Sequence, residues 1–154
     1  MIKILFICHG NICRSVACEY VMKDIVKENG KEKDYFIESA ATSTEEIGNT
    51  VYPPMERTLR KHKVNIGSHR ARQIRRSDYN EYDYLIGMDR ENMWNMQRVW
   101  REDEAGKIHY LMDFTNTPGE VSDPWYTRDF ERTYRDVKAG CEGLFSSIEK
   151  DRNL

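Results

Sequence analysis

A short apolar segment at the start of the chain, residues 2–7, limits what this sequence can fold into. It is rich in isoleucine and contains one charged residue, Lys3, which is typical of a strand buried in a parallel sheet. A compact loop over residues 8–15, the Cys8 loop, follows directly, and residues 16–26 then carry apolar side chains at helical spacing. The sequence therefore predicts a buried strand, a tight loop and a helix in immediate succession.

The Cys8 loop combines residues that would bind an oxyanion. A loop that closes onto a helix N-terminus points several backbone N–H groups into one hollow, and the helix dipole adds positive charge there. Arg14 adds a planar fork of donors that can hold two phosphate oxygens. Cys8 would be favoured as a thiolate by the same field and would be placed to attack a bound phosphorus atom. The alternative is a buried, inert cysteine in an ordinary strand-to-helix turn.

Strand patterns alternate with helix patterns along the remainder of the chain. Strands are predicted at residues 35–40, 82–88 and 108–111, and helices at residues 53–62, 90–100 and from 127 or 128 to 150. This alternation predicts an α/β fold, a single-domain three-layer sandwich whose four-stranded parallel sheet has helices on both faces. Ligands bind at the carboxyl ends of the strands in such folds, and the Cys8 loop follows strand one at that end.

Length and composition are those of an ordinary globular protein. A chain of 154 residues fits one domain over residues 1–154, and 39% apolar with 32% charged residues is normal for a soluble protein. No apolar run approaches the ~20 residues that span a membrane, and the N-terminus lacks a signal-peptide pattern. We therefore expect a cytoplasmic protein without membrane insertion. The net charge of −2 gives no indication of nucleic-acid binding.

The spacing of the cysteines does not indicate a metal site. The cysteines at positions 8, 13, 18 and 141 form neither a disulfide framework nor the C-x2-C pairs of a zinc site, so no metal site is expected.

One segment of the chain is strongly basic. Residues 57–76 contain no acid and eight basic residues. They are Arg57, Arg60, Lys61, Lys63, Arg70, Arg72, Arg75 and Arg76. This segment is either a solvated surface or a positive surface that steers anionic substrates.

The Cys8 loop resembles the C-x-G-N-x-C-R-S signature of the low-molecular-weight protein-tyrosine phosphatases. In this sequence it consists of Cys8, His9, Gly10, Asn11, Ile12, Cys13, Arg14 and Ser15. Residues 123–126, Asp-Pro-Trp-Tyr, are similar to the segment that carries the general acid of that family. Weaker matches at residues 39–43, 68–72 and 83–89 follow the family's order, so the resemblance covers nearly the whole chain. Val16 departs from it, since the family usually has proline there, and we expect only a small cost in stability.

The resemblance implies a two-step hydrolysis of phosphotyrosine through a cysteinyl-phosphate. Cys8 would be the nucleophile, and Arg14 with the loop N–H groups would hold the phosphate, in place of the metal ions that other phosphatases use. No cofactor is therefore expected. Asp123 would protonate the tyrosine leaving group and then take a proton from water, while Ser15 stabilises the departing thiolate. Taken alone, Asp123 could instead be a turn-forming residue before proline.

Two residues are expected to support the Cys8 loop, and one to protect it. Asn11 tolerates positive φ better than most residues, and by resemblance Ser39 and His69 hydrogen-bond to it. His69 could instead be an exposed loop histidine. By resemblance Cys13 would resolve oxidised Cys8 to a disulfide, although it could simply be a small side chain that packs the loop.

The substrate slot is predicted from side chains around the Cys8 loop. By resemblance Ile12, Trp125 and Tyr126 form the apolar walls of a deep slot. A flat ring fits between such walls, whereas phosphoserine is too short to bring its phosphorus to Cys8. The expected partners are phosphotyrosine proteins or peptides, with inorganic phosphate as the product. Glu45 stands at the rim, where some relatives carry an aromatic residue.

Three other functions remain open at this point. An arsenate reductase of the same fold would need two further cysteines as a relay, and this chain has none between Cys18 and Cys141. A protein-arginine phosphatase would carry threonine where Ile12 stands, so Ile12 favours an aromatic substrate. A phosphate- or phosphopeptide-binding module without activity would lack Cys8 or Asp123, and both are present.

Overall fold

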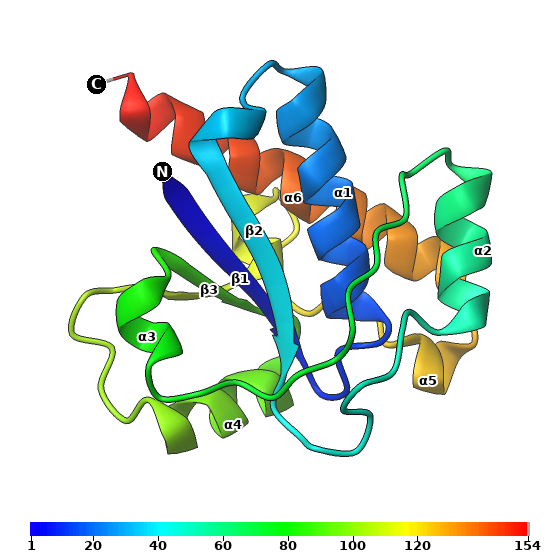
Figure 1. Ribbon diagram of the computed structural model, residues 1–154, viewed down its shortest axis with the longest axis horizontal. Coiled ribbons are helices and arrows are strands. Elements are labelled where there is room, and N and C mark those ends of the chain that lie inside the picture. The colour runs from blue at the N-terminus through cyan, green and yellow to red at the C-terminus, as the bar shows by residue number, and fades with distance from the viewer. Residues whose placement is uncertain (154) are drawn as a thin grey trace.

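A computed structural model gives the fold of this chain, and the structure describes residues 1–153. Four parallel strands form one sheet in the order β2-β1-β3-β4. The strands are β1 (Ile2–Cys8), β2 (Tyr35–Ala41), β3 (Tyr84–Gly87) and β4 (Ile108–Tyr110). The predicted four-stranded parallel sheet is therefore confirmed, and the first predicted strand is one of its two central strands (Figure 1).

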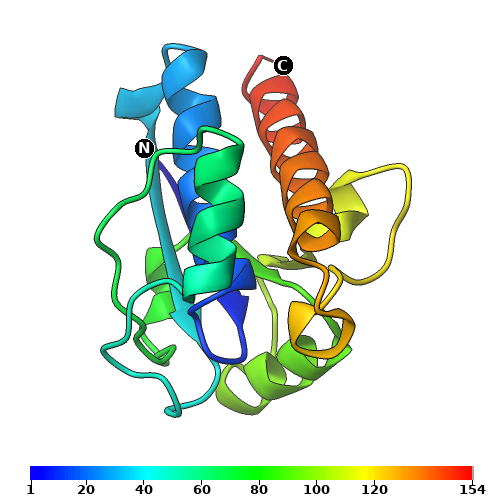
Figure 2. The same ribbon diagram turned by 90° about the vertical axis from the view of Figure 1, so that its right-hand side faces the viewer.

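Helices cover both faces of the sheet (Figures 1 and 2). The α-helices are α1 (Arg14–Glu28), α2 (Pro53–Lys61), α3 (Asp78–Glu81), α4 (Arg90–Val99), α5 (Pro124–Thr127) and α6 (Phe130–Arg152). Two short 3-10 helices, η1 (Glu32–Asp34) and η2 (Leu111–Phe114), complete the elements. Helices α1, α2 and α6 pack on one face and α4 on the other, which confirms the three-layer arrangement.

Strand β1 is buried on both faces, as its apolar sequence predicts. Ile4 and Phe6 point into the larger core, which α1, α2 and α6 cover. Leu5 and Ile7 point the other way, into a smaller core beside α4. All four side chains have no exposed surface. This burial fixes the position of the carboxyl end of β1, from which the Cys8 loop starts.

The structure differs from the predicted elements mainly near residue 128. The last helix begins at Phe130 rather than at residue 127 or 128, because Arg128 adopts a left-handed conformation (φ 59°). That residue ends α5, a short helix that the sequence did not predict. Strand β3 is also shorter than predicted, since Tyr82 and Asp83 precede it. The apolar stripe of α6 lies in the larger core as expected, through Phe130, Tyr134, Val137, Cys141, Leu144, Phe145 and Ile148.

The helices are short or strongly charged. Within residues 1–153, none is both long and apolar enough to cross a membrane.

Candidate active site

The Cys8 loop joins the end of β1 to the start of α1. Figure 2 shows it at one end of the molecule, between the segment that follows β2 and the short helix α5. Cys8 is the last residue of β1 and is almost fully buried. Among the described residues, no side chain caps the first turn of α1, so its N–H groups remain available to an anion. The chain therefore builds the anion-binding end of a 15-residue helix directly beside a cysteine.

The sulfur of Cys8 is held by polar groups of its own loop. It lies 3.0 Å from Oγ of Ser15 and accepts a hydrogen bond from the backbone N–H of Asn11 at 3.4 Å. The N–H of Asn11 donates to the sulfur, and the Ser15 hydroxyl is placed to donate to it when Cys8 is a thiolate. The serine hydroxyl is itself fixed, because it accepts a hydrogen bond from Nδ2 of Asn11 at 2.8 Å.

Asn11 has the positive φ that its residue type predicts. Its φ of 61° lies in the left-handed region, and its side chain is buried. Oδ1 accepts hydrogen bonds from Nε2 of His69 at 2.6 Å and from the backbone N–H of Arg72 at 3.3 Å. The predicted contact between His69 and Asn11 is therefore confirmed. Because the carbonyl oxygen of Asn11 can only accept, the network assigns a proton to Nε2 of His69.

The predicted hydrogen bond between Ser39 and Asn11 is wrong. Oγ of Ser39 instead donates to Oε1 of Glu19 at 2.6 Å, and the same carboxylate lies 3.4 Å from Nδ1 of His69. Ser39 thus supports Asn11 indirectly, through Glu19 and His69. Burial lowers the pKa of His69, and the carboxylate of Glu19 opposes that effect.

Glu19 is a site-supporting residue that sequence reasoning missed. It is almost fully buried on α1 and is also paired with Lys23 at 2.7 Å. A signal was present, because it is the one acid among the otherwise apolar residues 16–22. A lone acid on a buried helix face requires partners.

Arg14 is buried and has two acidic partners. Its Nη2 lies 2.8 Å from Asp89 and 3.4 Å from Asp123, and its Nη1 donates to the carbonyl of Val121 at 3.2 Å. Burial alone would lower the pKa of Arg14, but Cys8, Asp89 and Asp123 raise it above its ordinary value. The guanidinium is therefore a fixed positive charge next to Cys8.

Asp89 has a second role that the sequence did not reveal. It caps α4 as predicted, accepting a hydrogen bond from the N–H of Asn92 at 2.8 Å. Its other oxygen contacts Arg14. In the sequence, an aspartate that only caps a helix looks the same as one that also contacts an arginine. Only the fold reveals the second contact.

Asp123 lies across the opening of the loop from the segment after β2. It caps α5 by accepting a hydrogen bond from the N–H of Trp125 at 3.0 Å, while its other oxygen faces Arg14. The side chain is 31% exposed. A carboxyl group that is close to the arginine yet reached by solvent has the position that proton transfer at the loop would need.

The predicted slot residues differ in exposure, and the slot itself stays a prediction. Trp125 and Tyr126 on α5 are 73% and 80% exposed. Ile12 is half-buried, and its carbonyl accepts a hydrogen bond from the N–H of Tyr52 at 2.7 Å. Glu45 contacts His9, with 3.0 Å between Oε2 and Nε2.

Cys13 is half-buried at the start of α1. Burial raises the pKa of its thiol above the ordinary value, and the charge of Cys8 adds to this effect. Cys18 and Cys141 lie deeper and have no exposed surface.

The basic segment is partly neutralised. Arg60 pairs with Glu56, Lys61 with Glu131, and both Arg72 and Arg75 with Asp78. Steering of anionic substrates by this segment stays a prediction.

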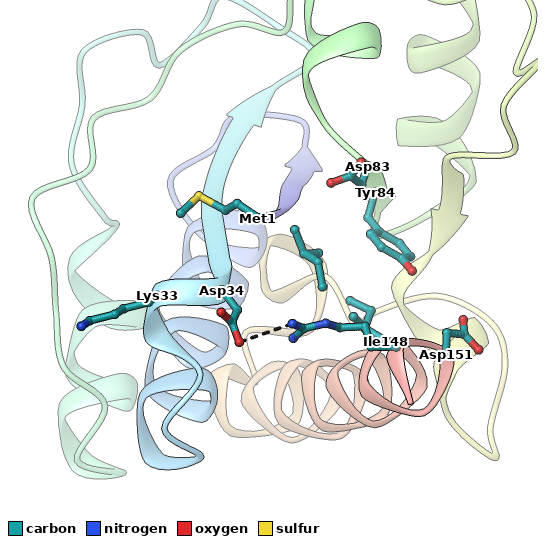
Figure 3. A pocket seen from close by; sticks show the side chains of 9 residues that line it. Met1, Lys33, Asp34, Asp83, Tyr84, Ile148 and Asp151 are labelled. Carbon is teal, nitrogen blue, oxygen red and sulfur yellow. Dashed lines mark hydrogen bonds and ion pairs between the residues drawn. The ribbon is translucent and has the colours of Figure 1, made fainter. Parts of the chain in front are cut away.

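A separate cavity lies elsewhere in the structure. It has a volume of about 520 Å³ and is found at the amino end of β1, where Met1, Asp83 and Tyr84 face the end of α6 (Figure 3). An ion pair between Arg152 and Asp34, 3.4 Å long, crosses it. The Cys8 loop is at the opposite end of the strand, so this cavity is separate from the candidate site.

A parallel sheet flanked by helices, with a central strand that ends in a cysteine and an uncapped helix that begins with a buried arginine, is the arrangement expected of a cysteine-dependent phosphatase of the α/β class. The family model described as low molecular weight phosphotyrosine protein phosphatase matches residues 3–154. The chain belongs to this family.

Individual relatives agree with that assignment. The low molecular weight protein-tyrosine-phosphatase YfkJ of Bacillus subtilis is 33% identical over 100% of both chains. Low molecular weight phosphotyrosine protein phosphatase 1 of Drosophila melanogaster is 37% identical over 90% of this chain and 92% of that one. The crystal structure of YfkJ superposes with a TM-score of 0.94 and 33% identity, covering 98% of this chain and 96% of that chain.

The fold alone does not choose the substrate. A crystal structure named as a Drosophila arginine phosphatase superposes with a TM-score of 0.86 at 22% identity, over 96% of this chain and 98% of that chain. The choice between phosphotyrosine and phosphoarginine therefore depends on individual side chains.

Proposed function

We propose that residues 1–154 act as one protein-tyrosine phosphatase domain, with Cys8 as nucleophile, Arg14 as phosphate clamp and Asp123 as general acid and base. The observation that carries this proposal is the position of the Cys8 sulfur, 3.0 Å from Ser15 and beside the uncapped start of α1. The family membership of the chain supports the same reaction.

In the first step the Cys8 thiolate attacks the phosphorus and forms a sulfur–phosphorus bond, while the bond to the tyrosine oxygen breaks. Arg14 and the N–H groups of the loop hold the equatorial oxygens, over which negative charge spreads. Asp123 gives its proton to the leaving phenolate, whose conjugate acid has a pKa of about 10.

In the second step water attacks the cysteinyl-phosphate. Asp123, now a carboxylate, takes a proton from that water, and inorganic phosphate leaves. The sulfur leaves as a thiolate, which the Ser15 hydroxyl stabilises from its position 3.0 Å away.

Phosphotyrosine is the substrate that the walls of the site favour. In the proposed slot, exposed Trp125 and Tyr126 on α5 and Ile12 in the loop would flank a flat ring with apolar surface. Ile12 offers no hydroxyl to a guanidinium group, which argues against phosphoarginine. Phosphoserine is shorter and would leave its phosphorus short of Cys8.

The test compares turnover with anion binding. Cys8→Ser should abolish hydrolysis of p-nitrophenyl phosphate and of phosphotyrosine, yet still bind tungstate, because backbone N–H groups and Arg14 remain. Arg14→Lys should lose nearly all activity, since a point charge cannot replace the planar fork. Cys8→Ser activity above about a tenth of the wild type would remove Cys8 as nucleophile.

Substrate class is tested separately, by comparing phosphotyrosine with phosphoarginine. Faster release of phosphate from phosphoarginine would overturn the proposed substrate while leaving the proposed nucleophile in place.

A further inference from the structure

His9 and Glu45 form a contact at the rim of the Cys8 loop that the proposed reaction does not use. Nε2 of His9 lies 3.0 Å from Oε2 of Glu45, and the two side chains are 45% and 69% exposed. His9 directly follows the nucleophile in the chain, and Glu45 belongs to the segment after β2. The contact therefore fixes one carboxylate at the opening of the site.

The backbone around this contact is also tied to the Cys8 loop. The carbonyl of His9 accepts hydrogen bonds from the N–H of Ser43 at 3.1 Å and from its hydroxyl at 2.9 Å. The carbonyl of Cys8 accepts one from the N–H of Thr42 at 2.9 Å. Because these bonds join the segment to the loop, Glu45 keeps a defined distance from the reacting centre.

The contact with His9 leaves the carboxylate of Glu45 open to a second partner. An imidazole that carries its proton on Nε2 satisfies the contact. Nδ1 of His9 is buried and has no hydrogen-bond partner among residues 1–153. Within the same residues, Glu45 has no further ion-pair partner. The neighbouring Glu46 differs, because its carboxylate accepts a hydrogen bond from Asn49 at 2.6 Å.

We propose that Glu45 is a rim subsite for a lysine or arginine side chain next to the phosphotyrosine of the substrate, with His9 as its positioning residue. This inference rests on the proposed function, since it concerns the peptide that surrounds the phosphotyrosine. The bound phosphotyrosine ring would lie between the segment after β2, to which Glu45 belongs, and α5 (Figure 2). A residue adjacent to the phosphotyrosine must then pass along one of these two rims. Asp123 at the α5 rim already faces Arg14, whereas Glu45, 69% exposed, has no ion-pair partner but His9 among residues 1–153.

The experiment uses matched phosphotyrosine peptides that differ only in arginine or glutamate at the residues flanking the phosphotyrosine. Wild-type kcat/KM should favour the arginine peptide. Glu45→Gln should reduce that preference by about two- to fivefold, which is the usual worth of an exposed ion pair. Glu45→Lys should reverse the preference. Glu46→Gln is the matched control, because it removes the same charge one residue further along and should leave the preference largely in place.

Two readouts separate specificity from a structural role. The preference for arginine should shrink as salt is raised, since the pair is exposed. His9→Leu should weaken the preference by freeing Glu45, and His9→Gln, which keeps a donor, should restore most of it. Every rate is normalised to that of the same variant on p-nitrophenyl phosphate, which has no flanking residues.

Failure of this inference and failure of the proposed function give different results. Equal preference in wild type and Glu45→Gln, or no preference in the wild type, would overturn the rim subsite while the phosphatase activity stands. Hydrolysis of p-nitrophenyl phosphate without turnover of any phosphotyrosine peptide would overturn the proposed substrate, and the subsite with it.

Discussion

A carboxylate oxygen of Asp89 lies 2.8 Å from Nη2 of Arg14, and both side chains are largely buried, with 17% and 5% of their surface exposed. The same aspartate caps α4. The orientation of the arginine is therefore set by the start of a helix on the opposite face of the sheet from α1. A charged pair in such surroundings is worth more than one at the surface.

Replacing Asp89 by asparagine tests that relationship. Asparagine caps helices about as well as aspartate, so α4 should survive. The charge-assisted contact to Arg14 is weakened, and we expect kcat/KM to fall about tenfold, which is the loss expected when a bond of ~1.4 kcal/mol is removed. Steady-state rates on p-nitrophenyl phosphate measure the effect. An unchanged kcat/KM would show that Asp123 and the carbonyl of Val121 suffice to orient the arginine.

Asp123→Asn tests the general acid. Asparagine keeps the cap on α5, where the present side chain accepts from the N–H of Trp125. We expect the rate on tyrosine phosphate to fall by about 10²-fold or more. Esters with an acidic leaving group need less protonation, so their rates should fall less. Equal losses on both kinds of substrate would indicate that the Asp123 carboxylate acts structurally, through its contact with Arg14, and not as a proton donor.

The Cys8 loop shows which structural features the sequence can predict. The strand, loop and helix could be predicted because each has a local signal: an apolar run, a Gly-Asn pair and apolar residues at helical spacing. Asn11 has the positive φ that its residue type favours. The contact of His69 with Asn11 followed from the family resemblance. The local elements needed no knowledge of how distant segments meet, whereas for this contact, between residues 58 apart in sequence, the resemblance supplied it.

The remaining contacts depend on distances between segments that local patterns do not contain. Ser39 contacts Glu19 instead of Asn11 because one strand of the sheet and the buried face of α1 bring them together. Asp89 contacts Arg14 because β3 lies directly beside β1. Helix α5 escaped prediction since its four residues are too few to show a helical period.

Oxidation should produce a disulfide between Cys8 and Cys13. Peroxide converts the Cys8 thiolate to a sulfenic acid, and the Cys13 sulfur then displaces the hydroxyl, which leaves as water with the thiol proton. Because burial raises its pKa, Cys13 stays a neutral thiol until Cys8 has reacted. Peroxide should thus inactivate the enzyme in a way that dithiothreitol reverses, and Cys13→Ala should lose much of the recovery.

Mass spectrometry of the oxidised protein identifies the partner. Cys18 and Cys141 have no exposed surface and serve as internal alternatives. A link from Cys8 to either of them, or equal recovery in Cys13→Ala, would contradict the prediction.

The stability of the protein should fall as the pH drops below neutrality, in part through His69. Its folded-state pKa is lowered by burial, so the unfolded chain, with a histidine pKa of about 6.5, takes up the proton first. The contribution of His69 is therefore fully present above pH ~6.5 and is lost as the pH falls toward the folded-state pKa. Urea midpoints between pH 7.5 and 5 should fall more steeply in the wild type than in His69→Gln.

Carboxylates with lowered pKa values, such as Glu131 and Glu149, lose their contributions only at lower pH. A wild type that instead gains stability over this range, relative to His69→Gln, would mean that attraction by Glu19 outweighs burial.

The central place of β1 has a consequence for the growing chain on the ribosome. Its neighbour on one side, β2, ends at Ala41, but its neighbour on the other side, β3, is complete only at Gly87. The apolar strand β1 must therefore wait with one edge unpaired until synthesis has reached Gly87. The reactive thiol at its end is thus made early and enclosed late, so the nascent protein passes through a period in which Cys8 is open to oxidants without the surroundings that later control it.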